Sequence, residues 1–223
     1  MWSTRSVNNI TVNGQGQGKR TANARGEIVG FKTTPSVDIV VGEAGAAYET
    51  PLNRFTRAII FVKPELVVVY DRLAAKEPST FEYWLHAVNK MTVKDQHDIQ
   101  VQNGDVVCDI DFLTPGGLSF KQTDQYDPNP EPSIKLREWH LTGATSGKSK
   151  EVEFVTLYRP HRISDAGPSA SKLDRIDGGY VLTAKLSGGE FTALLPTDDA
   201  KTLEVQSLTT TDTIKLKLEK AGR

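Results

Sequence analysis

The chain has little that could cross-link it or carry it through a membrane. Cys108 is its single cysteine among 223 residues, so a disulfide within the chain is impossible. No apolar run approaches the roughly 18 residues that a membrane helix needs, and no signal peptide is visible after Met1. The formal net charge is -1, with 25% charged residues and no basic block. We therefore expect neither nucleic acid nor a membrane as a partner.

Several common chemical signatures are also missing. No G-x-S-x-G nucleophile elbow occurs, and the glycine-rich stretch 14–18 is not followed by a helical pattern that could hold a phosphate. His97 and His161 lack metal-ligand spacing to another histidine or cysteine. The loop around Tyr126 has spaced oxygens but lacks the glycine and terminal glutamate of an EF-hand. The sequence predicts no cofactor and no metal.

What the sequence does contain is alternation with a period of two. Ala58 to Val62 and Leu66 to Tyr70 are short, β-branched and aromatic, and they flank Pro64, so they predict an antiparallel hairpin. The run Leu66 to Val69 has no polar alternation, which indicates a strand covered on both faces. Cys108 shares a strand face with other apolar residues and is interpreted as a core thiol. Similar patterns recur at 10–12, 28–31, 37–41, 106–112, 134–139, 152–158, 181–186 and 214–218.

Turn chemistry such as Asn13-Gly14 and Gly188-Gly189 separates these patterns. We predict an all-β fold, a large antiparallel β-sandwich with two or more stacked sheets and roughly 12 to 15 strands. Residues 1–223 are expected to form a single domain. Three polar stretches, 122–133, 142–150 and 164–172, are predicted to be long loops.

Two segments carry a family resemblance. The first runs from Val7 through Ile10-Thr11-Val12-Asn13-Gly14 to Gln17. The second runs from Arg57 to His86 and contains the proline corner, Tyr70-Asp71 and Leu85-His86. Together they resemble the C-terminal β-sandwich of heparinase II/III-like polysaccharide lyases, which act on heparin, heparan sulfate and alginate. The match is specific over roughly the first 90 residues and is a generic β pattern beyond them.

The resemblance implies the C-terminal part of a larger, secreted bacterial lyase whose α/α toroid precedes the sandwich and supplies most catalytic residues. Nothing in this sequence resembles that toroid. Some members bind zinc through a histidine of the sandwich, and Val7 occupies that position here. Because an isopropyl group cannot bind zinc, we predict that this metal site is absent.

Candidate site residues follow from the resemblance and from the chemistry of uronate binding. His86 matches the family's Leu-His position and is the weak candidate for catalysis, although a structural histidine is the more ordinary interpretation. Trp139 could form an aromatic platform beside Lys135 and Arg137, with Tyr126 on a neighbouring loop, as substrate-binding residues. The alternative for Trp139 is packing under a loop. Asp71 and Arg72 are predicted to be structural, with Asp71 capping a turn or pairing with Arg57.

Two functions remain open. The first is the sandwich portion of a lyase that acts on or binds an anionic, uronate-containing polysaccharide, inactive or weakly active without a toroid. The second is a stand-alone carbohydrate-binding module without catalysis. A self-contained site built from His86, His140 and tyrosines ranks last, because no carboxylate pair or positioned nucleophile is evident. The expected partner is a polysaccharide or oligosaccharide, and the expected location of the parent protein is extracellular or periplasmic.

Overall fold

The computed structural model describes residues 3–50, 52–126, 133, 138–206 and 213–218. Over these residues the chain forms seventeen strands and two short 3-10 helices, η1 (Thr4–Ser6) and η2 (Gly45–Ala47). The predicted all-β class is confirmed, with more strands than expected because short ones such as β7 (Thr92–Val93) are present. None of the described helices has the length and apolarity needed to cross a membrane.

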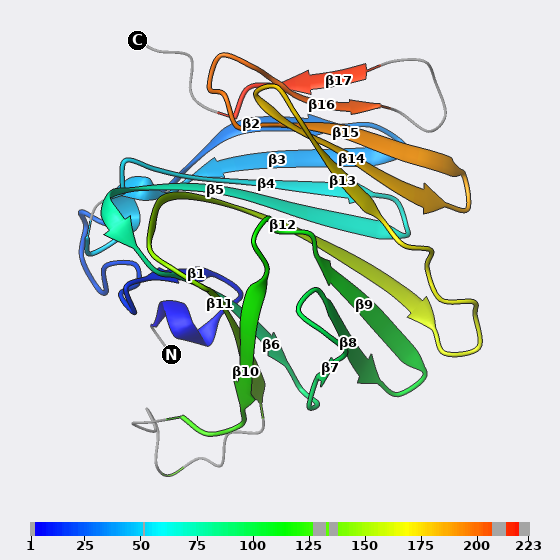
Figure 1. Cartoon of the computed structure of the whole chain (residues 1–223), viewed down its shortest axis with the longest axis horizontal. Coiled ribbons are helices and arrows are strands. Elements are labelled where there is room, and N and C mark those ends of the chain that lie inside the picture. The colour runs from blue at the N-terminus through cyan, green and yellow to red at the C-terminus, as the bar shows by residue number, and fades with distance from the viewer. Residues whose placement is uncertain (1–2, 51, 127–132, 134–137, 207–212, 219–223) are drawn as a thin grey trace.

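The strands form three antiparallel sheets stacked in layers, with the largest sheet in the middle (Figure 1). The central sheet has the order β2-β3-β4-β5-β12-β9-β8-β7, the four-stranded sheet β1-β6-β11-β10, and the five-stranded sheet β13-β14-β15-β16-β17. The central strands other than β7 are β2 (Glu27–Thr33), β3 (Val37–Glu43), β4 (Arg54–Val62), β5 (Leu66–Ser79), β8 (Asp98–Asn103), β9 (Val106–Phe112) and β12 (Ser149–Arg162). The four-stranded sheet contains β1 (Ile10–Val12), β6 (Phe81–Ala87), β10 (Leu118–Thr123) and β11 (Trp139–Thr145), and the five-stranded sheet contains β13 (Lys172–Ile176), β14 (Gly179–Leu186), β15 (Gly189–Pro196), β16 (Leu203–Gln206) and β17 (Thr213–Leu216).

Two hydrophobic cores lie on the opposite faces of the central sheet. Val68 and Tyr70 of β5 face the core shared with the five-stranded sheet, where they join residues such as Phe191 and Leu195. Leu73 and other alternate residues face the core shared with the four-stranded sheet. Because successive side chains of a strand point to opposite faces, a strand between two cores needs apolar residues at every position. In the apolar run after Pro64, Leu66 and Val68 lie in the first core, and on the other face Val69 is buried and Val67 half-buried.

Strand β5 extends well past the predicted end at Tyr70 and continues through Asp71 and Arg72 to Ser79. The strand tolerates these charges because each finds a partner of opposite sign. Asp71 is fully buried and accepts two hydrogen bonds from Arg57, from Nε to Oδ1 at 2.6 Å and from Nη2 to Oδ2 at 2.9 Å. Burial raises the pKa of Asp71, and the Arg57 charge opposes that rise. The pairing alternative predicted for Asp71 is therefore confirmed, whereas the turn-capping alternative is wrong.

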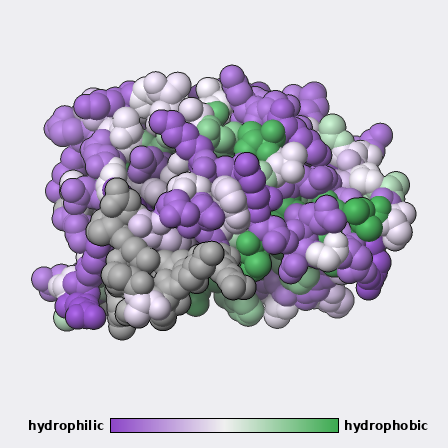
Figure 2. All heavy atoms as spheres, turned by 90° about the horizontal axis from the view of Figure 1, so that it is seen from below, coloured by the Kyte–Doolittle hydropathy of each residue, from purple (hydrophilic) through white to green (hydrophobic). Residues whose placement is uncertain are grey.

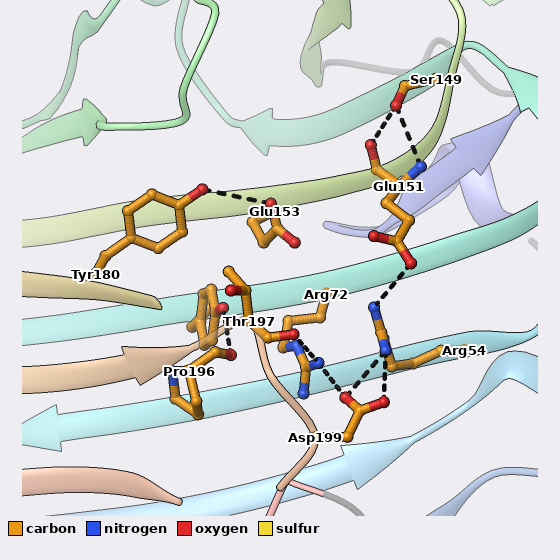
Figure 3. A network of polar contacts seen from close by, with 10 residues as sticks. Arg54, Arg72, Ser149, Glu151, Glu153, Tyr180, Pro196, Thr197 and Asp199 are labelled. Carbon is orange, nitrogen blue, oxygen red and sulfur yellow. Dashed lines mark hydrogen bonds and ion pairs between the residues drawn. The ribbon is translucent and has the colours of Figure 1, made fainter. Parts of the chain in front are cut away.

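Arg72 points to the other face of β5 and ties the central sheet to the five-stranded sheet (Figure 3). Its side chain is 1% exposed, and its guanidinium donates to the Thr197 carbonyl at 2.7 Å and pairs with Asp199. Arg54 also binds the Asp199 carboxylate, at 3.0 and 3.1 Å. One half-exposed carboxylate thus binds two arginines between the layers, and Glu151, 3.7 Å from Arg54, supplies a second negative charge. The prediction that Arg72 is structural agrees with this position.

The loop predicted over 142–150 is wrong, because β11 continues to Thr145 and β12 begins at Ser149. The small residues that suggested a loop have a packing role. A Cβ added to Gly143 would lie 2.8 Å from Cε1 of Phe120, so the glycine lets that ring pack directly on the backbone. Glycine within a strand here marks a close approach and not a turn.

Candidate functional site

The outward face of the four-stranded sheet gathers ring side chains from two neighbouring strands and a loop. On β6, Phe81, Tyr83 and Leu85 point into the core, so the alternation turns Trp84 and His86 outward. Strand β11 pairs with β6 so that His140 lies directly opposite His86. Seen from the side of this sheet, the surface is mostly hydrophilic with a few separate hydrophobic patches (Figure 2).

Four rings of this face form a contiguous group, which we call the ring cluster: Trp84, His86, His140 and Tyr126. The His140 ring lies at the centre, with centroid distances of 5.8 Å to Trp84, 6.0 Å to His86 and 4.6 Å to Tyr126. Tilted rings at these separations are in favourable contact. The cluster presents both apolar ring faces and polar ring atoms on one side of a rigid sheet.

His86 is held by the segment that precedes β1. Its Nε2 lies 2.8 Å from the Arg5 carbonyl and its Nδ1 lies 3.1 Å from Oδ1 of Asn8. Both oxygens are acceptors, so a neutral ring, which has one N–H, donates to one of them at a time. The same Asn8 oxygen accepts a hydrogen bond from the His86 backbone N–H at 2.9 Å. Both ring nitrogens therefore face oxygen atoms of the protein itself. These contacts are of the kind expected for a structural histidine, and the catalytic role of His86 stays a prediction.

His140 differs because it is buried and its Nδ1 has no hydrogen-bond partner among the described residues. Burial lowers the pKa of His140, and the neighbouring His86 lowers it further. The imidazole is therefore neutral near pH 7 and can both donate and accept a proton.

Tyr126 covers one side of the His140 ring and donates a hydrogen bond from its hydroxyl to Oε2 of Glu138 at 2.9 Å. Burial, together with this bond and the Glu138 charge, raises the pKa of Tyr126 to about 12. The phenol therefore keeps its proton at neutral pH. It can position a ligand but is a poor proton acceptor.

The other side of the cluster is polar and carries a positive charge. The Arg5 guanidinium lies 5.9 Å from the centre of the Trp84 ring, within the range of a cation–π contact. The Trp84 indole N–H donates to Oγ1 of Thr11 at 2.8 Å, and that hydroxyl donates to Glu82 at 2.5 Å. These bonds fix the plane of the indole. Arg5 is exposed, so it can also reach an anionic group in solution.

The structure divides the predicted site residues. Tyr126 and His86 lie together in the ring cluster, whereas Trp139 lies on the opposite face of β11, where it packs against the core under the four-stranded sheet. The Nζ of Lys90 lies 5.3 Å from its ring centre. Lys135 and Arg137 fall outside the described residues, so the platform predicted around Trp139 stays a prediction.

Sequence reasoning missed two members of this face, Trp84 and Arg5. The alternation in Phe81 to His86 could have placed Trp84 beside His86, because residues two apart share a strand face. Nothing in the sequence indicated the register of β6 with β11, which brings His140 to the centre. Among the described residues no group of three or more histidines, cysteines, aspartates or glutamates could hold a metal ion. Val7, at the position of the family's zinc-binding histidine, is exposed.

Comparison with known proteins supports the fold and not an activity. No protein-family model matches the sequence, and neither does any curated protein. Among solved structures, the heparan sulfate lyase HepC from Pedobacter heparinus superposes with a TM-score of 0.65 and 15% identity, over 88% of this chain and 31% of that one. The heparinase III-BT4657 gene product matches with a TM-score of 0.64 and 13% identity, over 85% and 30%. A heparinase III crystal structure matches with a TM-score of 0.63 and 13% identity, over 85% and 29%.

This chain therefore spans less than a third of the length of these lyases, and identities of 13 to 15% establish common architecture alone. The predicted kinship is confirmed at that level. The chain has the β-sandwich fold that forms part of heparinase III-type polysaccharide lyases.

Proposed function

We propose that this β-sandwich forms one wall of a binding site for an anionic, uronate-containing polysaccharide, and that an α/α-toroid domain of the parent lyase completes the site. The observation that carries the proposal is the ring cluster with Arg5 beside it. Aromatic faces stack on the apolar faces of sugar rings, and a guanidinium pairs with carboxylate or sulfate groups. Such a surface recognises a charged sugar chain without requiring a bound metal.

The proposal assigns binding and positioning to this chain and leaves most of the chemistry to the toroid. β-elimination needs a base for the proton next to the uronate carboxylate, an acid for the leaving oxygen and a group that neutralises the developing charge. Both ring nitrogens of His86 face oxygen atoms of the protein itself, and Tyr126 keeps its proton. His140 is the one ring of the cluster that could move a proton. We therefore expect little or no lyase activity from the chain alone.

A stand-alone carbohydrate-binding module is the second candidate. It is favoured by the same engagement of His86, because a surface whose polar atoms are already held by the protein suits binding better than turnover. The two candidates share the ring cluster as ligand site. They differ in whether a toroid partner confers activity.

The test is oligosaccharide binding, with heparan sulfate and alginate fragments titrated into the purified chain by calorimetry. Trp84→Ala is expected to weaken binding by about tenfold, the size of one lost stacking contact. Trp139→Ala is the matched control, because that indole lies on the opposite face of β11. Loss of binding in Trp139→Ala alone would move the site to the predicted platform, and absence of binding to both polymers would contradict the proposal.

Activity is measured separately as the ultraviolet absorbance of unsaturated uronate product. We expect no absorbance increase from the chain alone, and an increase on adding a lyase toroid domain. A rate from the chain alone would show that it holds its own catalytic site. A toroid that confers no activity would favour the stand-alone module.

We also propose an extracellular or periplasmic location for the parent protein, because uronate-containing polysaccharides lie outside the cell. Fractionation of the producing cell would test it. Recovery of the parent protein from the cytoplasm would contradict this location.

A further inference from the structure

Two of the four rings in the ring cluster are imidazoles, and they lie side by side on neighbouring strands. His86 and His140 are directly opposite each other across β6 and β11, with ring centroids 6.0 Å apart. Histidine is the side chain whose charge ordinarily changes between about pH 5 and pH 8. Because two positive rings this close would repel each other, the pair takes up its first proton more readily than its second. The surroundings of each ring decide which of them is charged first.

The surroundings of His86 suit the charged form of its ring. Nε2 lies 2.8 Å from the Arg5 carbonyl and Nδ1 lies 3.1 Å from Oδ1 of Asn8. A protonated ring has two N–H groups and donates to both oxygens at once, whereas a neutral ring turns a lone pair toward one of them. The ring is half-buried and keeps one side toward water. A proton on His86 therefore adds a charge-assisted hydrogen bond to the protein.

The surroundings of His140 oppose a charge. The residue is buried, and its Nδ1 has no hydrogen-bond partner in the part of the chain that the structure describes. Burial lowers the pKa of His140, and the neighbouring His86 lowers it further. The first proton therefore goes to His86, and His140 stays neutral beside it.

The fixed charges around the two rings do not by themselves favour an anion. Lys121 lies on the outward face in the row of Thr142 and Trp84, which crosses β10, β11 and β6. Strand β1 contributes no charged residue. The charged side chains near the rings, within the described ranges, are Arg5 from η1, Lys121 from β10, Glu82 from β6, and Glu138 and Asp124 from the segments next to β11 and β10. Two cations face three carboxylates, so a positive charge on His86 evens the balance.

The same proton also holds a cation of the site in place. The oxygen that faces Nε2 of His86 is the backbone carbonyl of Arg5. The guanidinium of Arg5 donates to the Gly14 carbonyl at 2.8 Å and lies 5.9 Å from the centre of the Trp84 ring. A stronger hydrogen bond from His86 fixes the backbone from which this guanidinium reaches the ring cluster.

We propose that His86 is a proton-controlled switch of the ring cluster, which binds the anionic sugar chain more tightly when this ring is charged than when it is neutral. The switch rests on the proposed function, because it acts only where the ring cluster is the sugar site. One added charge about 6 Å from a bound carboxylate strengthens binding about threefold in water-like surroundings, and by more where the local dielectric constant is lower. Affinity should therefore rise as the pH falls from 8 to 5.5.

The test is calorimetric titration of alginate oligosaccharides into the purified chain at pH 5.5, 6.5 and 8. Uronate carboxylates keep their charge throughout this range, so a change in affinity reports on the protein. We expect binding to be about three- to tenfold tighter at pH 5.5 than at pH 8. Equal affinity at the two ends would overturn the switch and leave the proposed function standing, whereas no binding at any pH would overturn both.

Variants of single histidines assign the proton, with the ratio of affinities at pH 5.5 and pH 8 as the readout. The ratio should fall to about one in His86→Gln. It should be kept in His140→Gln, and also in His161→Gln, because His161 lies on β12 of the central sheet. A ratio kept in His86→Gln and lost in His140→Gln would place the proton on the wrong ring and overturn the proposal.

NMR of the ¹⁵N-labelled imidazoles follows the same proton in the unsubstituted chain, so the test does not depend on the folding of a variant. As the pH is lowered, His86 should gain its second N–H at a higher pH than His140 does. The reverse order would overturn the proposal.

Discussion

The buried pair of Arg57 and Asp71 makes the sharpest prediction, through the variant Arg57→Met. Asp71 is fully buried, and Arg57 supplies both of the side-chain hydrogen bonds that its carboxylate accepts. Methionine keeps the apolar stem of the arginine and removes its charge. The variant leaves a carboxylate in the core with no cation to oppose the effect of burial on its pKa.

The magnitude follows from the two ways in which the protein can respond. Keeping the buried carboxylate charged costs several kcal/mol, and removal of one partner of a buried pair typically destabilises by 3–5 kcal/mol. Protonating it instead costs about 1.4 kcal/mol for each pH unit above the unfolded pKa of about 3.9, which is about 4 kcal/mol at pH 7 and about 1.5 kcal/mol at pH 5. We therefore expect Arg57→Met to lose about 4 kcal/mol at pH 7.

The sign of the pH dependence is fixed by the direction of the pKa shift. Burial raises the folded-state pKa of Asp71, and removing Arg57 raises it further. A raised carboxyl pKa means that stability is greatest below pH 4 and falls as the pH rises. The stability of Arg57→Met itself should therefore fall by about 2–3 kcal/mol between pH 5 and pH 7, and that of the wild type, whose Asp71 pKa is raised less, should fall by less.

The assay is urea unfolding followed by tryptophan fluorescence at several pH values between 5 and 8. The double variant Arg57→Met with Asp71→Asn is the control, because it has no group left to titrate and its loss should not vary with pH. A loss in Arg57→Met that is the same at pH 5 and pH 8, or below about 1 kcal/mol at pH 7 as for an exposed pair, would refute the reasoning.

Three further outcomes are expected. Asp199→Ala removes the carboxylate that pairs with the buried Arg72, and it should lower the free energy of unfolding in urea by about 2–4 kcal/mol. The control Asp105→Ala, whose ion pair with Arg162 is exposed on both sides, should lose under about 1 kcal/mol. Equal losses would contradict the role of Asp199 in holding the layers together. Gly143→Ala should cost about 1–3 kcal/mol in the same assay, because its new Cβ meets the Phe120 ring, and a neutral result would show that the ring can move aside. In an NMR titration the pKa of His140 should lie below 6.5, because burial and the neighbouring His86 lower it. The pKa of His161 should lie above 6.5, because its hydrogen bonds to the Arg162 carbonyl and to Asp109 raise it. The reverse order would contradict both environments.

The histidine shifts also set opposite trends in stability. The lowered pKa of His140 means that its contribution is lost as the pH falls below about 6.5. The raised pKa of His161 means that its contribution is present below about 6.5 and is lost as the pH rises through the folded value. Urea unfolding of a His140→Gln variant should therefore show less loss on acidification than the wild type.

Much of the fold was accessible from the sequence because burial leaves a local signature. The unbroken run from Leu66 to Val69 predicted a strand covered on both faces; one face lies in a core, and on the other Val69 is buried and Val67 half-buried. The stretch from Thr142 to Thr145 was misread because small residues occur both in loops and where a ring packs against a strand, and only the position of Phe120 separates the two cases. Likewise the end of β5 was placed too early, since the partners of Asp71 and Arg72 come from elsewhere in the chain.

By itself, the sequence determined that this chain is an all-β protein, because alternation and turn residues act over a few neighbouring positions. Which rings meet on the four-stranded sheet was decided by the tertiary structure. His86 and His140 are more than fifty residues apart, and the register of β6 with β11 that sets them opposite each other comes from packing of the whole sheet on its core.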